Sequence, residues 1–156
     1  MSPVNPRAVG LICASYKGSD GHFIVDALSA DGGNSPRSVQ ILYGLALVRF
    51  GCLTVNELAT KVSDNPARMI GLDSKGHLGV GADGDITVLD LERGKAVMTI
   101  VGGKVVMKDG HVTGQASTII TTPKGEKALK DAGFSCVVND PGKGWMYTPR
   151  SKRFSR

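Results

Sequence analysis

The sequence is poor in the residues from which many catalytic and disulfide-bonded proteins are built. It has three histidines and three cysteines among 156 residues, and 5% of its residues are aromatic. Cys13, Cys52 and Cys136 are odd in number, widely spaced, and include no Cys-x-x-Cys pair. Scattered thiols argue against a disulfide framework and suit a reducing compartment. We therefore expect a cytoplasmic protein in which these cysteines act as small apolar side chains.

Long apolar runs are also missing. No run approaches the roughly 20 apolar residues of a membrane-spanning helix. The start, MSPVNPRAVG, lacks the charged region and apolar core of a signal peptide. We expect neither a membrane anchor nor a signal peptide.

The formal charge of +5 comes from the C-terminus. Residues 143–156, KGWMYTPRSKRFSR, hold five basic residues and no acidic one, and the other 14 basic residues equal the 14 acidic ones. Such a tail could contact phosphates and stack its aromatic rings on bases. Because basic tails are more often solvated or packed on a partner chain, we expect no nucleic-acid partner.

The first half of the chain predicts strands followed by helices. AVGLICA at 8–14 and HFIVDALSA at 22–30 are typical of strands. A helix is predicted over 36–50, with Ser35 as its N-cap and Gly51 just past its end. This helix is apolar nearly all round, so an isolated chain should expose part of it as a hydrophobic patch and should associate.

Two shorter helices are expected next. Thr54 and Glu57 form a capping box at the start of the first. Ser63 or Asp64 caps the second, and Gly71 ends it.

The pattern then changes to the alternation of antiparallel strands, over 82–92 and 96–114. Gly102-Gly103 and Asp109-Gly110 predict tight turns. The match of residues 79–84 to G-x-G-x-x-G precedes a strand and opens no helix, so it predicts a turn rather than a dinucleotide site. Beyond 115, a short helix over 124–133 and a strand over 134–138 are expected.

Residues 53–92 and 97–114 resemble the C-terminal portion of the metal-dependent amidohydrolase superfamily, which includes dihydroorotases, hydantoinases, isoaspartyl dipeptidases and N-acyl-amino-acid deacylases. The shared features occur in order as Asn65-Pro66-Ala67, Gly71-Leu72, Gly76, Gly81, Asp85, Asp90, Gly103-Lys104 and Asp109-Gly110. The likeness extends over about 23–114. It implies an α/β plus β fold: the last strands and helices of an incomplete TIM-type (β/α)8 barrel in residues 1–72, and a small composite β-sandwich in 73–115. Residues 116–156 would be a partly ordered extension with the basic tail.

The same resemblance places Asp31 at the C-terminal end of the last barrel strand, where barrel active sites lie. Its carboxylate would contact a divalent metal, zinc, take a proton from the attacking water and give it to the leaving nitrogen. Gly32, Gly33, Asn34 and Arg37 would line the substrate side, together with Ser29. Two alternatives stay open: Asp31 merely begins an Asp-Gly turn, or Asp26 is the acid instead.

A complete barrel needs about 250 residues, more than this chain has. The family's metal site also needs more histidines than His22, His77 and His111 can supply. We therefore expect a C-terminal fragment or subunit that binds little or no metal and is inactive alone. In the complete enzyme it would serve hydrolysis of a C–N bond in a small amide, cyclic amide or isopeptide. Its partner would be a chain carrying the N-terminal barrel strands, or further copies of itself. The alternative is a non-catalytic complementing or binding subunit of β-sandwich type.

Overall fold

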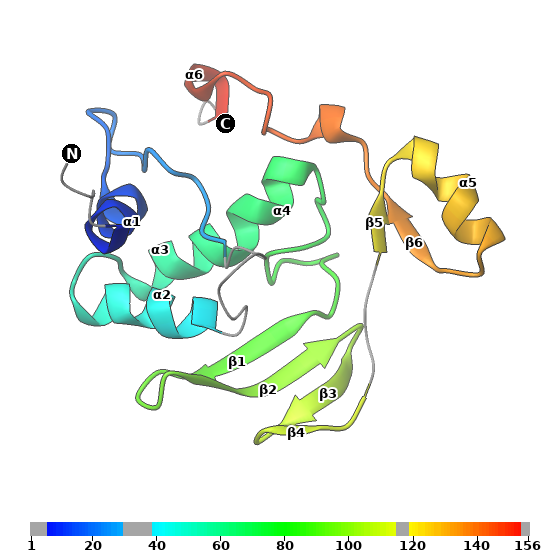
Figure 1. The fold of residues 1–156 in the computed structure, drawn as a ribbon, viewed down its shortest axis with the longest axis horizontal. Helices are drawn as coiled ribbons and strands as arrows, with labels where there is room; N and C mark the ends of the chain where they lie inside the picture. Colours follow the sequence, from blue (N-terminus) through cyan, green and yellow to red (C-terminus); the bar gives the residue numbers. More distant parts are fainter. Residues whose placement is uncertain (1–5, 30–38, 115–118, 154–156) are drawn as a thin grey trace. The chain divides into compact units, whose positions relative to one another are not determined.

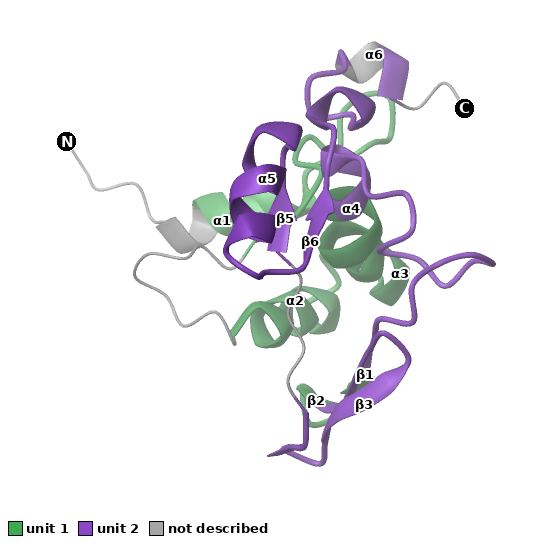
Figure 2. Ribbon diagram, turned by 90° about the vertical axis from the view of Figure 1, so that its right-hand side faces the viewer, with its two compact units in different colours: residues 1–66, 89–96 green, residues 67–88, 97–156 purple. Residues whose placement is uncertain are grey.

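The computed structural model describes residues 6–29, 39–114 and 119–153 (Figure 1). The helical elements are α1 Pro6–Ser15, α2 Gln40–Arg49, α3 Val55–Ala59, the π-helix η2 Thr60–Asp64, α4 Asn65–Ile70, α5 Pro123–Asp131, the 3-10 helix η3 Pro141–Lys143 and α6 Arg150–Arg153. The strands are β1 Ile86–Asp90, β2 Lys95–Val101, β3 Lys104–Lys108, β4 His111–Val112, β5 Ile119–Thr121 and β6 Cys136–Val138. The chain forms two units, residues 1–66 with 89–96 and residues 67–88 with 97–156 (Figure 2).

The core of the first unit lies between α2 and the following helix. Its buried residues are Leu45, Leu53 and Leu58. Around them pack half-buried apolar side chains, namely Phe23, Leu28, Ile41, Leu47, Val48 and Val62. The two helices approach closely at Gly44, where an added Cβ would lie 2.6 Å from a methyl carbon of Leu58.

The predicted end of the helix over 36–50 is confirmed. Gly51 has φ of +71°, and the amides of Gly51 and Cys52 donate to the carbonyls of Val48 and Leu47 at 2.9 Å each. This is a Schellman motif, which needs a left-handed residue that glycine supplies without steric cost. The predicted cap, Ser35, lies outside the described residues.

The expected break between the second and third helices is wrong. Residues 55–70 form one continuous helical segment, because both residues flanking the π-helix, Ala59 and Asn65, keep right-handed helical angles. Ser63 and Asp64 therefore lie inside a helical segment and not at the start of a new helix. Pro66 has no N–H to donate to the carbonyl four residues earlier, and the π-helical turn just before it accommodates that loss without ending the helix. Gly71, with φ of +78°, ends the segment as predicted.

The strands expected in 8–30 are also corrected. Residues 8–14 belong to helix α1, and residues 22–29 contain a single isolated bridge, between Lys17 and Phe23. A strand needs a neighbour for its backbone groups, and alternating apolar residues alone do not provide one. Among the described residues the segment 24–29 bonds instead to side chains of Gln40, Lys61 and Asn65 and to the backbone carbonyls of Tyr16 and Lys61.

The predicted antiparallel strands are confirmed. They form one sheet in the order β1-β2-β3-β4, and β2 and β3 pair with a bulge between Thr99 and Ile100. Gly102 and Gly103 both have positive φ and join Val101 to its partner Lys104. These two positive angles match the right-handed twist of the hairpin.

The predicted turn at Asp109-Gly110 is built in the same way. Asp109 has φ of +49° and Gly110 has φ of +84°, and they join Lys108 to its partner His111 across β3 and β4.

The region beyond 118 adds a small β-α-β unit. Strands β5 and β6 pair in parallel and are joined by α5, so the helix and the strand expected there are confirmed. The described residues thus form a small mixed helix and sheet fold without a closed barrel. The two sheets differ in type, one antiparallel and one parallel, and the composite sandwich stays a prediction.

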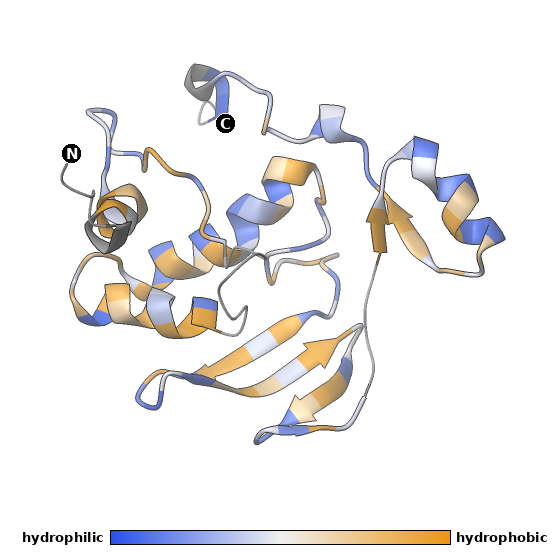
Figure 3. Cartoon of the chain, in the orientation of Figure 1, coloured by the Kyte–Doolittle hydropathy of each residue, from blue (hydrophilic) through white to orange (hydrophobic). Residues whose placement is uncertain are grey.

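Helix α2 exposes apolar side chains, as predicted from its sequence. Leu42 is 50% exposed and Tyr43 is 64% exposed, whereas Leu45 on the same helix is 3% exposed. Phe50, at the end of the helix, is 81% exposed. Figure 3 shows the hydrophobic colouring of α2. None of the described helices is long and apolar enough to cross a membrane.

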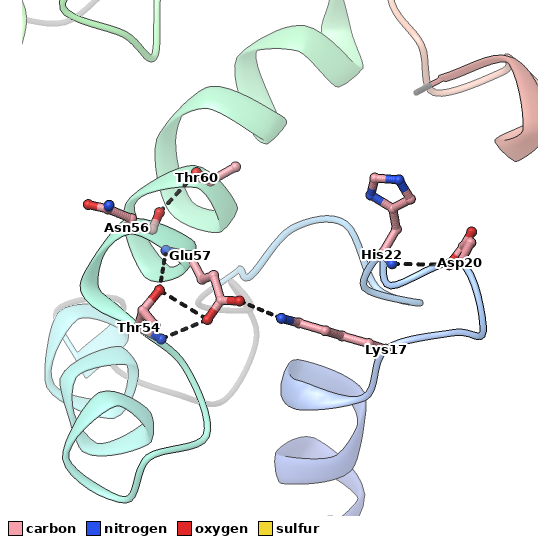
Figure 4. A network of polar contacts seen from close by, with 7 residues as sticks. All are labelled: Lys17, Asp20, His22, Thr54, Asn56, Glu57 and Thr60. Atoms are coloured by element: carbon pink, nitrogen blue, oxygen red, sulfur yellow. Dashed lines mark hydrogen bonds and ion pairs between the residues drawn. The ribbon is translucent and has the colours of Figure 1, made fainter. Parts of the chain in front are cut away.

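A polar network joins the loop after α1 to the start of α3 (Figure 4). The predicted capping box is confirmed, because Glu57 donates its amide to the Thr54 hydroxyl and accepts from the Thr54 amide at 2.7 Å. The other carboxylate oxygen of Glu57 pairs with Lys17 Nζ at 2.6 Å. The Lys17 ammonium, together with the Thr54 amide, lowers the pKa of Glu57 to about 2.

Glu57→Gln should reveal this pair through its pH dependence. Glutamine keeps an acceptor for the Thr54 amide but removes the charge. Because the folded-state pKa lies below the ordinary 4.5, the charge stabilises the fold above pH 4.5, and the effect is lost as the pH falls toward 2. Because the pair is partly exposed, we expect a loss of about 1 kcal/mol at pH 7. The measurement is urea unfolding followed from pH 7 to pH 2. The free energies of unfolding of the parent chain and of Glu57→Gln should converge as the pH falls. Adding Lys17→Met to the Glu57→Gln variant should cause little further loss of stability, because the ion pair is already broken. A loss that is independent of pH would refute the assignment.

Gly84→Ala should destabilise the second unit. An added Cβ at Gly84 would lie 2.8 Å from the amide nitrogen of Gly103, which itself donates to the Gly84 carbonyl at 2.9 Å. Because that neighbour is backbone, we expect a cost of about 1–3 kcal/mol in thermal unfolding. Gly10→Ala, in a helix where an added Cβ meets nothing within 4 Å, is the control and should be neutral or stabilising. Equal effects of the two substitutions would contradict this steric account.

Candidate functional site

The residues predicted to form the catalytic and metal site lie outside the described residues. They are Asp31, Gly32, Gly33, Asn34 and Arg37. The described chain reaches Ser29, two residues before Asp31, and Ser29 is exposed. The segment that leads to Asp31, residues 23–29, is therefore the part of the predicted site that the structure describes.

Segment 23–29 is held by side chains of the neighbouring helix. Lys61 Nζ donates to the carbonyl of Val25, and Asn65 Nδ2 donates to the carbonyl of Asp26 at 2.6 Å. The amide of Leu28 donates to the carbonyl of Lys61 at 3.0 Å. These three bonds join one extended segment to one helical segment, 55–70.

A fourth bond comes from helix α2. Gln40 Nε2 donates to the carbonyl of Leu28 at 2.9 Å. The side chains of Phe23 and Leu28 pack against the leucine core of the first unit. The segment is thus fixed by polar bonds along its backbone and by apolar contacts at both of its ends.

Lys61 carries the strongest electrostatic constraint in this region. It is fully buried, with a relative exposure of 0%. Its ammonium lies 4.0 Å from the centre of the Phe23 ring, a cation–π distance. Burial lowers the pKa of Lys61, while the carboxylates of Asp26 and Glu57 act in the opposite direction.

Asp26, the alternative acid, lies inside this arrangement. It is half-buried, its carbonyl accepts from Asn65, and its carboxylate favours the charged form of Lys61. These contacts give Asp26 a role in holding the segment.

The described residues contain no group of three or more His, Cys, Asp or Glu side chains that could hold a metal ion. His77 lies in a turn, where Nδ1 accepts from the amide of Gly79 at 3.0 Å and Nε2 lies 2.9 Å from the carbonyl of Asp73. His111 is exposed in β4. The described residues by themselves therefore do not fit a divalent metal site.

The second unit contains a cluster of three charged side chains, Lys75, Asp83 and Asp85, which holds a turn in place. Lys75 Nζ pairs with Asp83 at 2.9 Å and with Asp85 at 2.5 Å, and Asp85 also accepts from the amide of Gly102 at 2.8 Å. The Lys75 ammonium lowers the pKa of both carboxyl groups. The cluster fixes the turn before β1 to the hairpin of β2 and β3.

Lys61 and Asn65 were missed in the sequence, although a signal for them exists. Leu58, Lys61, Val62 and Asn65 follow the i, i+3, i+4, i+7 spacing of one helix face. A lysine and an asparagine at positions that face the core must find partners there.

Comparison with known proteins identifies the region that carries the likeness. The sequence profile of the amidohydrolase family matches residues 43–107. A dihydroorotase of Methanothermobacter thermautotrophicus is 34% identical over 92 residues, covering 44% of this chain and 21% of that protein. A dihydroorotase of Syntrophus aciditrophicus is 33% identical over 104 residues, covering 51% of this chain and 24% of the relative. One of Pyrococcus horikoshii is 26% identical over 134 residues, covering 70% of this chain and 30% of the relative.

The chain thus spans between about a fifth and a third of the length of these relatives. The predicted resemblance is confirmed over the helices α2 to α4 and the strands β1 to β3, which lie within or overlap the matched residues. Residues 43–107 of the chain are thus similar to the amidohydrolase family, and the dihydroorotases share this likeness over part of their length.

Proposed function

We propose that this chain is the C-terminal fragment or subunit of a metal-dependent amidohydrolase that hydrolyses a C–N bond in a small amide, cyclic amide or isopeptide. The observation that carries the proposal is the match of residues 43–107 to the amidohydrolase family. Relatives named dihydroorotase support a substrate with a cyclic amide, since dihydroorotate has one.

In this proposal Asp31 is the acid of the active site. A carboxylate beside the scissile bond can take a proton from the attacking water and return it to the leaving nitrogen. Gly32, Gly33, Asn34 and Arg37 follow directly in the sequence and would contact the substrate. A divalent metal such as zinc, when bound in the complete enzyme, would polarise the carbonyl.

The isolated chain is proposed to be inactive. Among its described residues there is no set of three ligands for a metal. The relatives are several times longer than the matched region, so most of their length has no counterpart in this chain. The missing strands would come from another polypeptide or from a longer form of the same one.

A complementing role without catalysis is the second candidate. It is favoured by the exposed apolar side chains of α2, Leu42 and Tyr43, together with Phe50 just beyond it, because large exposed apolar surfaces often mark interfaces. In that case the chain would complete the fold of another protein, and the substitution of Asp31 would leave that protein's activity unchanged.

The decisive experiment compares the purified chain with material immunopurified from its native cells. Denaturing electrophoresis gives the size of the native polypeptide, and elemental analysis gives its metal content. Hydrolysis is assayed with dihydroorotate, hydantoin, an isoaspartyl dipeptide and an N-acyl amino acid. We expect bound metal and hydrolysis of at least one substrate in the native material only. Asp31→Asn introduced in the native gene should reduce kcat by about 100-fold or more, as loss of a general acid–base does.

Two results would contradict the proposal. Native material that binds metal but hydrolyses none of the four substrate classes would refute the C–N hydrolase. Full activity in the Asp31→Asn protein would refute Asp31 as the acid and would leave Asp26 as the acid or the complementing role as the remaining candidates.

A further inference from the structure

The segment before Asp31 is fixed in a way that a barrel strand is not. Its carbonyl groups at Val25 and Asp26 accept from two side chains, Lys61 and Asn65, that come from one helical segment. In a regular strand successive carbonyls point to opposite sides and bond to neighbouring strands. Here adjacent carbonyls both bond to one helix, so the helix determines the local path of the backbone.

The spacing of the two donors explains how one helix does this. Lys61 and Asn65 are four residues apart and therefore lie on the same helix face. Lys61 belongs to the π-helix Thr60–Asp64, and Asn65 follows that π-helix directly as the first residue of α4. The carbonyl of Lys61 accepts from the Leu28 amide on the same side.

Lys61 makes this attachment hard to release. Its side chain is fully buried, and its ammonium lies between the Val25 carbonyl and the ring of Phe23. If residues 23–28 moved away, the ammonium would lose both its hydrogen-bond acceptor and its aromatic partner, which is unfavourable. The attachment therefore favours one conformation of the segment.

From these contacts we propose that Lys61 and Asn65 are positioning residues that fix the chain at 25–28 and so set where it enters the stretch carrying Asp31. The proposal rests on the proposed function, in which Asp31 is the active-site acid. Lys61 and Asn65 themselves would contact neither substrate nor metal. Their role would be to hold the chain three to six residues before Asp31, at the two carbonyls and the amide that they bind.

Hydrogen exchange of the full chain, measured peptide by peptide, tests the attachment. Lys61→Met removes the ammonium donor and keeps the length of the side chain. Asn65→Leu removes the side-chain amide donor and keeps a side chain of similar size. We expect each to speed exchange in residues 24–29 by about tenfold or more relative to residues 44–49 of α2, which would report local rather than global opening. Lys61→Arg keeps a charged donor and should restore most of the protection.

Matched controls come from the same unit. Lys95→Met and Asn56→Leu replace an exposed lysine and an exposed asparagine. We expect them to leave the exchange of residues 24–29 within about twofold of the parent chain. If Lys61→Met instead speeds exchange equally in 24–29 and 44–49, Lys61 is a general stabiliser and the proposal is overturned.

A second measurement follows position 31 itself. In a chain with serine at positions 13, 52 and 136, Asp31→Cys and Asn56→Cys carry spin labels whose distance distribution is recorded. Lys61→Met and Asn65→Leu should broaden that distribution, and Lys61→Arg should not. An unchanged width in the first two variants would show that they do not position residue 31.

Neither measurement involves metal or catalysis. If the native material proves unable to hydrolyse amides, the attachment of residues 25–28 to Lys61 and Asn65 can still be demonstrated. Only the proposed catalytic role of Asp31 would then be refuted. If the attachment fails and the native material is active, the proposed function stands and the positioning role is lost.

Discussion

The arrangement of the first unit depends on one buried ammonium group. Lys61 is fully buried, and a buried charge is tolerated when hydrogen bonds and neighbouring charges compensate for the lost water. The Val25 carbonyl, the Phe23 ring and the carboxylate of Asp26 supply that compensation, and all three come from one short segment. The extended segment and the helical segment 55–70 therefore require each other. The leucine core beside them adds apolar contacts on the same side.

Features decided by a few neighbouring residues were predicted well from the sequence. The capping box of Thr54 and Glu57 and the glycine ends at Gly51 and Gly71 formed as expected. So did the two-residue turn at Gly102-Gly103, because positive φ at both positions is available to glycine at little cost. Each of these depends on the geometry of four to six consecutive residues and hardly on the rest of the fold.

Features that depend on distant partners were predicted poorly. Residues 8–14 combine valine, leucine, isoleucine and cysteine, which suit a strand when neighbouring strands exist and a helix when they do not. A new helix was expected to begin at Ser63 or Asp64, whereas a π-helical turn lets the preceding helix continue through Pro66. Of the predicted site, the Asp31 group lies outside the described residues. Lys61 and Asn65 were missed because their partners are about 36 to 39 residues away in the sequence.

The family likeness and the side-chain contacts locate different parts of the proposed site. The matched residues 43–107 include Lys61 and Asn65 but not the segment 23–29 that they bind. A match of this kind identifies the helices that serve as a scaffold, and a fold alone does not specify a reaction. In the proposed site, the position of the acid would depend on which backbone groups the scaffold binds. Both donors belong to the matched helical segment, so polar side chains of the scaffold hold the unmatched residues 25 and 26. In the proposed function, the inner face of helix 55–70, rather than the sheet, is therefore the part of this chain that would position the active-site acid.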